Sequence, residues 1–190
     1  MASAPIADMS IFRGIQTYFY NQSLDKLRKR RAKAKPPVSF EAARNIGILF
    51  DATELEERET VLAYAKELRN KLKQVRLLGF FDNKLNDSNF TFHYFNRKNI
   101  DWAQRPGGEF VEEFIEMEFD WLFNLALKPN PQFEYIAALS RARLRVGPMT
   151  DNTFCYDIMI DAEGGSLRDF IQQMELVLAK TNTQHEAANI

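Results

Sequence analysis

Three aspartates close apolar runs of the chain and are the residues best placed to do chemistry. Asp51, Asp82 and Asp161 each follow a short stretch with the composition of a buried strand. Ligands of open α/β sheets bind outside the carboxyl ends of the strands, so carboxylates gathered there could hold a magnesium ion or act as acid and base. The alternative is that they cap turns and helices by accepting backbone hydrogen bonds. Because no nucleophile accompanies them at a telling spacing, we favour the capping role and expect neither a metal nor a cofactor.

The run of residues 140–145 offers a second candidate site. Arg141, Arg143 and Arg145 stand at alternating positions, so three guanidinium groups could together bind an anion. The same run follows an expected helix, and cations at a helix C-terminus complement its dipole. A solvated helix end is therefore the alternative explanation.

Other familiar catalytic patterns are missing from the sequence. No glycine has the spacing of a dinucleotide fingerprint or stands in a Walker loop. His93 and His185 have no cysteine or acid cluster beside them with which to build a metal site. The single cysteine, Cys155, lies in an apolar run that reads as a strand and lacks the basic setting that activates a thiol, which predicts a buried, inert side chain. These observations favour a protein that is not an enzyme.

The distribution of charge is the most unusual property of the chain. Eight lysines and arginines against two aspartates give residues 1–35 a charge of +6, so the remainder sums to −7 although the whole chain carries −1. Such asymmetry indicates an interaction arm on a mildly acidic body. Pro36-Pro37 ends any helix and marks the boundary. The cations of the second half of the arm are Lys26, Arg28, Lys29, Arg30, Arg31, Lys33 and Lys35.

The arm also carries an apolar stripe at helical spacing, made of Ile11, Phe12, Ile15, Tyr18 and Phe19. A basic amphipathic helix could bind RNA or the ribosome by counterion release, lie on an anionic membrane, or dock on an acidic protein partner. The alternative is that the arm packs its stripe on its own domain. Because base-reading features are few, nonspecific RNA contact through residues 26–35 is the favoured functional form.

Composition and length fit one domain with an appendage. The 190 residues are 45% hydrophobic and 13% aromatic, which is enough for a sizeable core without a disulfide or a metal. The first residues lack the cationic start and apolar run of a secretory signal, and no stretch reaches the roughly 18 to 20 apolar residues of a membrane span. We expect a cytoplasmic protein.

After the arm, strand and helix patterns alternate, which predicts a three-layer, Rossmann-like α/β fold. Its mainly parallel sheet has five or six strands with helices on both faces. A capping box in residues 53–56 starts the first helix of the domain, and Ser166 caps the last. The expected strands are 45–51, 75–82, 90–95, 120–125, 144–147 and 154–160, and the expected helices 53–73, 109–117, 133–142 and 166–180. The organisation is thus an arm over 1–37, a domain over 38–181 and a flexible tail over 182–190.

One stretch of this pattern is ambiguous. Residues 109–127 are apolar-rich throughout and could form a single long helix. The continuous apolar character of residues 121–125 favours a helix followed by a central strand.

Residues 133–147, preceded by 120–125, give the chain a resemblance to an uncharacterised protein family of the Bacteroidota, over most of residues 45–180. That resemblance implies a cytoplasmic bacterial protein and brings no function with it. The stretch Ser-x-Ala-x-x-Arg-Val-Gly at 140–147 is also similar to the N-terminal Rossmann-like half of heptosyltransferase-type glycosyltransferases. Those enzymes bind their donor between two such halves. With one half recognised here, the likeness implies a non-catalytic relative.

Overall fold

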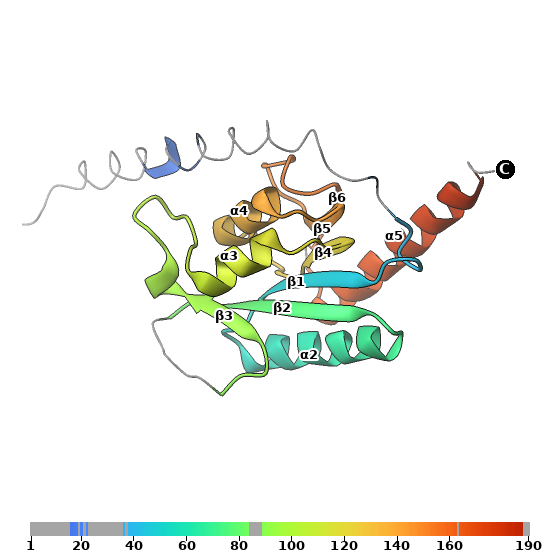
Figure 1. Ribbon diagram of the computed structural model, residues 1–190, viewed down its shortest axis with the longest axis horizontal. Coiled ribbons are helices and arrows are strands. Elements are labelled where there is room, and N and C mark those ends of the chain that lie inside the picture. The colour runs from blue at the N-terminus through green and yellow to red at the C-terminus, as the bar shows by residue number, and fades with distance from the viewer. Residues whose placement is uncertain are drawn as a thin grey trace, which may run out of the picture.

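Six parallel strands form one sheet in the order β3-β2-β1-β4-β5-β6 (Figure 1). The computed structural model describes residues 16–18, 20, 22, 36, 38–83, 89–162 and 164–187, with 181–187 as backbone alone. The strands are β1 (Asn45–Asp51), β2 (Gln74–Phe81), β3 (His93–Asn96), β4 (Trp121–Asn124), β5 (Leu144–Pro148) and β6 (Ile158–Ile160). This order confirms the predicted Rossmann-like sheet, with the reversal of strand order lying between β1 and β4.

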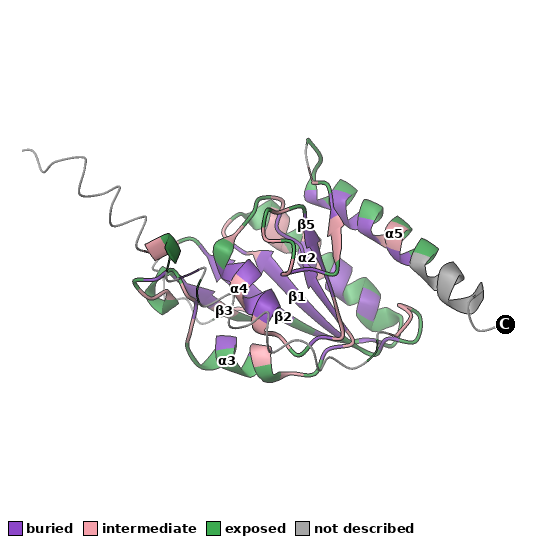
Figure 2. Ribbon diagram, turned by 90° about the horizontal axis from the view of Figure 1, so that it is seen from above, coloured by how far each residue is buried: buried purple, intermediate pink, exposed green. Residues whose placement is uncertain are grey.

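Helices cover both faces of the sheet, as the alternating pattern predicted. The helices are α2 (Leu55–Asn70), α3 (Glu109–Glu116), α4 (Pro131–Leu139) and α5 (Leu167–Ala187), with a 3-10 turn, η2 (Arg97–Asn99), after β3. Helices α2 and α5 pack on one face, where β1 contributes Ile46, Ile48 and Phe50. Helices α3 and α4 pack on the other, over Leu49 and Leu78. The two apolar cores enclose the central strands, which are buried nearly throughout (Figure 2).

The ambiguous stretch divides into a helix and a strand, so the single long helix is wrong. Helix α3 ends at Glu116, and Met117 already has an extended backbone. Asp120 Oδ2 then accepts hydrogen bonds from the N–H groups of Arg44 and Asn45, 2.8 and 3.0 Å away, at the start of β1. That carboxylate fixes the entry of β4 between β1 and β5, where all four of its residues are buried.

The first helix is not started by a capping box. Glu54 occupies the N-cap of α2 and no side chain caps it. The hydroxyl of Thr53, expected to cap the helix, instead accepts the N–H of Asp82 across the sheet at 2.9 Å. The cap of α5 is confirmed, because Ser166 and Asp169 exchange hydrogen bonds through their backbone N–H groups and side chains.

Three leucines in or beside helices are exposed, although leucine is usually buried. Leu55 and Leu72 stand at the two ends of α2, with exposed fractions of 58% and 78%, and Leu72 has left the helix with a φ of 60°. Leu176 is 64% exposed on α5, where Leu178 takes the buried position. Leu55 and Leu72 thus lie outside the buried stripe of α2, and the buried stripe of α5 is continued by Leu178.

Several elements are shorter or longer than the sequence pattern indicated. Strands β3 and β6 begin at His93 and Ile158, so the residues preceding them pack as loops. The ring of Phe90, for example, lies 4.9 Å from that of Phe81. Helix α4 ends at Leu139 instead of residue 142, and the backbone of α5 runs to Ala187, into the range expected to be a tail.

Candidate functional site

Two of the three candidate aspartates meet at the carboxyl ends of β1 and β2. Asp51 Oδ1 accepts the N–H of Thr53 at 2.9 Å, which closes a turn after β1. Asp82 follows β2 and pairs with Arg97, whose Nε lies 2.5 Å from Oδ1. Since the hydroxyl of Thr53 accepts the N–H of Asp82, the two turns are joined in one chain of hydrogen bonds. Both carboxylates act as turn and ion-pair partners of their own chain.

Asp161 does not join them. It follows β6, which is separated from β1 by β4 and β5. With neighbouring strands about 4.8 Å apart, this places β6 on the order of 14 Å from β1. Within the described part of the chain, no three histidine, cysteine or acidic side chains gather as metal ligands. The role of the three aspartates in ligand binding stays a prediction.

Sheets of this fold usually bind ligands outside the carboxyl ends of the strands where the strand order reverses, which here is at β1 and β4. The side chains near this position are acidic. Helix α2 starts beside it with Glu54, Glu56 and Glu57. Burial raises the pKa of the Glu57 carboxyl, and the neighbouring carboxylates of Asp51 and Glu54 raise it further, while Lys128 acts in the opposite direction. A helix N-terminus attracts phosphate through its free N–H groups, but a carboxylate at the N-cap and two in the first turn offset that attraction.

The three alternating arginines each have a carboxylate partner within the domain. Arg141 pairs with Glu116, Arg143 with Asp120 at 3.4 Å, and Arg145 with Asp157 at 3.4 Å. None lies on a helix, because α4 ends before them, so the alternative of a solvated helix end is wrong. An anion site made of these arginines stays a prediction, and any anion would compete with these pairs.

Arg145 is a buried structural residue of β5. Its Nη1 donates to the carbonyl of Ala137 at 3.0 Å, and its Nη2 to that of Phe154 at 2.8 Å. The guanidinium thereby ties β5 to the end of α4 and to the loop before β6. Nothing in the alternation of arginines distinguished Arg145 from its two neighbours.

A buried polar cluster at the ends of β4 and β5 escaped the sequence analysis. Glu134 on α4 accepts hydrogen bonds from Thr150 Oγ1 and Asn152 Nδ2, both at 2.6 Å. Asn124, the last residue of β4, donates from Nδ2 to the hydroxyl of Tyr156 at 2.6 Å. Burial raises the pKa of Tyr156, which keeps the phenol neutral. These polar groups are satisfied by one another, as buried polar groups must be, and hold the loop between β5 and β6.

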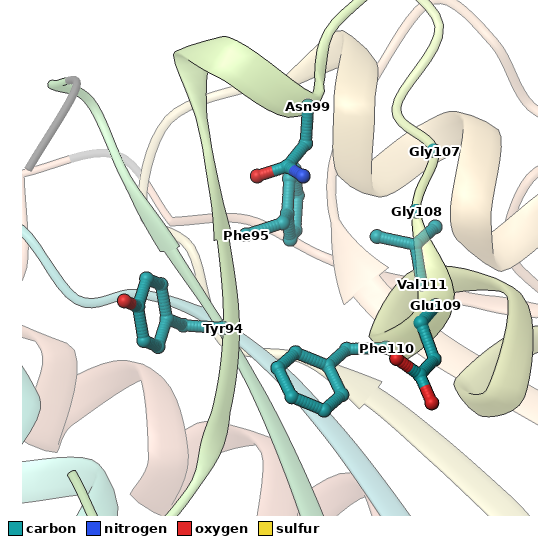
Figure 3. Close-up of a pocket in the computed structure, with 8 residues that line it drawn as sticks. All are labelled: Tyr94, Phe95, Asn99, Gly107, Gly108, Glu109, Phe110 and Val111. Atoms are coloured by element: carbon teal, nitrogen blue, oxygen red, sulfur yellow. The ribbon is translucent and has the colours of Figure 1, made fainter. Parts of the chain in front are cut away.

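The remaining candidate side chains of the domain pack against their neighbours or are buried. The ring of His93 stacks on that of Phe110 with centroids 4.2 Å apart. Cys155 is buried as predicted, in the loop before β6. The side chain of His185 lies outside the described residues. A hollow of about 210 Å3 separates Phe95 and Asn99 from the start of α3 (Figure 3).

Two described residues of the arm contact the α4 side of the domain. Tyr20 is 7% exposed, its hydroxyl donates to the carbonyl of Pro131 at 2.5 Å, and its ring lies 6.1 Å from that of Tyr135. Gln16 Nε2 donates to the carbonyl of Trp102 at 2.7 Å. We call these contacts of Gln16 and Tyr20 with the loop at 101–105 and the start of α4 the arm junction.

The predicted apolar stripe of the arm was wrong at Tyr18, which is exposed, and it missed Tyr20. Ile11, Phe12, Ile15 and Phe19 lie outside the described residues, as do the seven cations Lys26, Arg28, Lys29, Arg30, Arg31, Lys33 and Lys35. The burial of Tyr20 could not be predicted from the local sequence, because its hydrogen-bond partner Pro131 is 111 positions away in the chain.

Comparison with known proteins gives a family without a function. A family model described as a family of unknown function (DUF6913) matches residues 16–180. No curated protein and no solved structure matches the chain. In the part of the chain described, no helix is both long and apolar enough to cross a membrane.

Proposed function

We propose that this chain, which belongs to the DUF6913 family, is a non-catalytic binding protein whose basic N-terminal arm contacts a polyanion, RNA or the ribosome. One observation carries the proposal: residues 1–35 have a charge of +6, whereas the rest of the chain has −7. A dense run of lysine and arginine binds phosphates by releasing their counterions, and an acidic body repels them. Contact with a polyanion would therefore fall to the arm. A cytoplasmic, bacterial setting is part of the same proposal.

The acidic side chains near the strand ends also support a polyanion contact through the arm and not through the domain. A phosphate-bearing ligand in the usual position of the fold would meet Glu54, Glu56 and Glu57 at the start of α2. The chain after β1 also lacks the glycines that let a backbone approach phosphate closely. The common nucleotide site of such sheets is thus disfavoured, and the excess of positive charge lies elsewhere in the sequence.

The arm junction supports the proposal by giving the arm a fixed root. Tyr20 is buried against α4 and Gln16 donates to the carbonyl of Trp102, so the arm contacts the domain at these two residues. Lys26, the first of the seven cations, follows Gln22 by four positions. Fixing one end of a basic segment lowers the entropy lost when the segment binds.

The test is direct binding of a fluorescein-labelled single-stranded oligoribonucleotide to the full chain, followed by polarisation. The comparison variant changes the seven cations to glutamine and keeps Tyr20, because removing residues 1–35 would also remove a buried side chain. Loss of binding in that variant is expected. A control variant with Lys66, Lys71 and Lys128 changed to glutamine, all exposed on the domain, should bind as the unchanged protein does.

Equal binding by the seven-glutamine variant would refute the proposal. If the unchanged chain binds no oligonucleotide but binds anionic vesicles or an acidic protein, the arm serves a membrane or a protein partner, and the RNA form of the proposal is wrong.

A second candidate is a small Rossmann-like enzyme or a nucleotide or nucleotide-sugar binder that uses Asp51, Asp82 and Asp161. The strand order with its reversal between β1 and β4 favours it, because such sheets bind ligands at that point. The likeness of residues 140–147 to a glycosyltransferase half makes nucleotide sugars the first ligands to try. A specific ligand raises the melting temperature by mass action. A reproducible shift that Asp51→Asn abolishes would favour this candidate over the first.

A further inference from the structure

A hollow of about 90 Å3 lies between helix α3 and the first residues of β2 and β3. Its deeper wall is apolar, because the side chains of Leu77, Phe92 and Phe114 are buried. Its rim is formed by exposed side chains, which are those of Arg69, Arg76, Thr91, His93 and Phe110. Apolar and cationic groups therefore border the same small space.

The two arginines of this rim have no counter-charge of their own. Other arginines of the domain form ion pairs, which are those of Arg97, Arg105, Arg141, Arg143 and Arg145. Within the described residues, neither Arg69 nor Arg76 has a carboxylate partner. The carboxylate of Glu113, on α3, lies 3.9 Å from His93 Nδ1. Since the chain after residue 35 sums to −7, two unmatched guanidinium groups beside one hollow are a local exception to its charge.

The outer edge of β2 is open beside the same hollow. Strand β2 pairs with β1 from Gln74 onward but with β3 only from Leu78 onward. The carbonyl of Val75 points to this outer side, where it accepts a hydrogen bond from Arg69 Nη2 at 3.1 Å. Because the backbone groups of a strand alternate between its two sides, the N–H groups of Val75 and Leu77 point the same way. Two backbone donors are thus added to the two guanidinium groups.

We propose that this hollow is a binding site for a small organic carboxylate whose apolar end enters it. The planar fork of a guanidinium matches the two oxygens of a carboxylate, and the buried rings of the deeper wall match the apolar end. All the residues of the site belong to the domain, so the inference is independent of the arm and goes beyond the proposed function.

Size and charge decide between this ligand and a nucleotide. Pockets that enclose a drug-sized ligand measure about 300 to 1,000 Å3. A hollow of about 90 Å3 therefore takes one ring or branched chain and not a whole nucleotide. A phosphate ester would also bring two negative charges to a domain that is already acidic, whereas a carboxylate brings one.

Four probes test the two halves of the ligand, with the full chain isotope-labelled and its amide N–H signals followed by NMR. Benzoate carries a carboxylate and a ring, acetate the carboxylate alone, and benzyl alcohol the ring alone. Benzoate should shift the signals of Val75 and Leu77 and bind at least about 10-fold more tightly than acetate or benzyl alcohol, since each half contributes to binding. Phenyl phosphate should bind less tightly than benzoate.

Two variants assign the contacts. Arg76→Gln should weaken benzoate binding about 10-fold or more, the usual effect of losing a hydrogen bond between charged groups. Phe110→Ala should weaken the binding of benzoate and leave that of acetate unchanged. The matched control is Arg168→Gln, which removes an exposed arginine from α5 on the other face of the sheet and should alter neither.

Benzoate that binds Arg76→Gln as tightly as the unchanged chain overturns the inference. Acetate binding as tight as that of benzoate overturns it as well, because the hollow would then add nothing, and so does phenyl phosphate binding tighter than that of benzoate. The proposed function is tested separately, by the seven-glutamine variant with RNA.

Discussion

At the strand ends, polar side chains are satisfied by the chain itself, whereas at the arm junction a large apolar side chain is left open to solvent. The strand ends hold Asp82 in an ion pair with Arg97 and Glu134 between Thr150 and Asn152. At the arm junction, Trp102 is 52% exposed in a loop where Gln104 has a φ of 62°. The polar groups at the strand ends thus have structural partners within the chain, and in the proposed function binding falls to the arm. Changes at the strand ends should therefore alter stability, and changes at the arm should alter binding.

The largest loss of stability is expected from Arg145→Met. The substitution keeps an unbranched apolar stem but removes the hydrogen bonds of the guanidinium to the carbonyls of Ala137 and Phe154 and its ion pair with Asp157. Breaking a buried pair of this kind costs about 3 kcal/mol or more. Urea unfolding measures the effect. Arg141→Met, at an exposed ion pair, should cost no more than about 1 kcal/mol, and equal costs for the two variants would contradict the structural role of Arg145.

A smaller loss of stability is expected from Gly147→Ala, which overpacks the core beside the buried polar cluster. A Cβ added to Gly147 in β5 would lie 2.6 Å from the ring of Tyr156, so the ring or the strand must move. Gly147→Ala should lower the free energy of unfolding by about 1 to 3 kcal/mol. Gly107→Ala, in the loop that presents Trp102, is the matched control because nothing lies within 4 Å of the added carbon. Similar unfolding midpoints for the two variants would show that the loop after β5 is looser than described.

Tyr20 tests whether the root of the arm belongs to the core. Tyr20→Phe removes the hydrogen bond to Pro131 and should cost about 1 kcal/mol. Tyr20→Ala also removes a buried ring and should cost about 3 kcal/mol or more. Thermal unfolding distinguishes the two. If the alanine variant is no less stable than the phenylalanine variant, the ring is not packed on α4, and the arm is not anchored where the structure places it.

The smallest effect concerns the acidic start of α2. Because burial and Asp51 raise the pKa of Glu57, the folded chain holds that proton more tightly than the unfolded chain does. Stability from this group is therefore complete below its ordinary pKa of 4.5 and is lost as the pH rises through the higher folded value. Glu57→Gln should stabilise the protein at neutral pH by no more than about 0.5 kcal/mol, because solvent screens the partly exposed carboxylate. The gain should vanish in acid, and a gain that grows in acid would contradict the account.

The fold was predictable from the sequence because apolar runs such as residues 45–51 and 121–124 report buried parallel strands directly. Local chemistry predicted the cap at Ser166, whose partner Asp169 is three residues away. The same reasoning failed at Thr53, because its hydroxyl accepts the N–H of Asp82, which follows the neighbouring strand. The cluster around Glu134 was unpredictable for the same reason, since its donors come from a loop beyond β5. Trp102 gave no periodic signal, because its exposure depends on the bonds that close its loop.

The salt dependence of RNA binding tests the central claim most directly. Affinity of the full chain for a labelled oligouridylate is measured between 50 and 200 mM salt, beside the seven-glutamine variant. If the arm neutralises six or more phosphates, the affinity should fall by a factor on the order of 10³ over that range. The glutamine variant should show weak binding with little salt dependence. A shallow slope in the unchanged chain, or the same slope in both proteins, would contradict the claim that the arm is the polyanion-binding element.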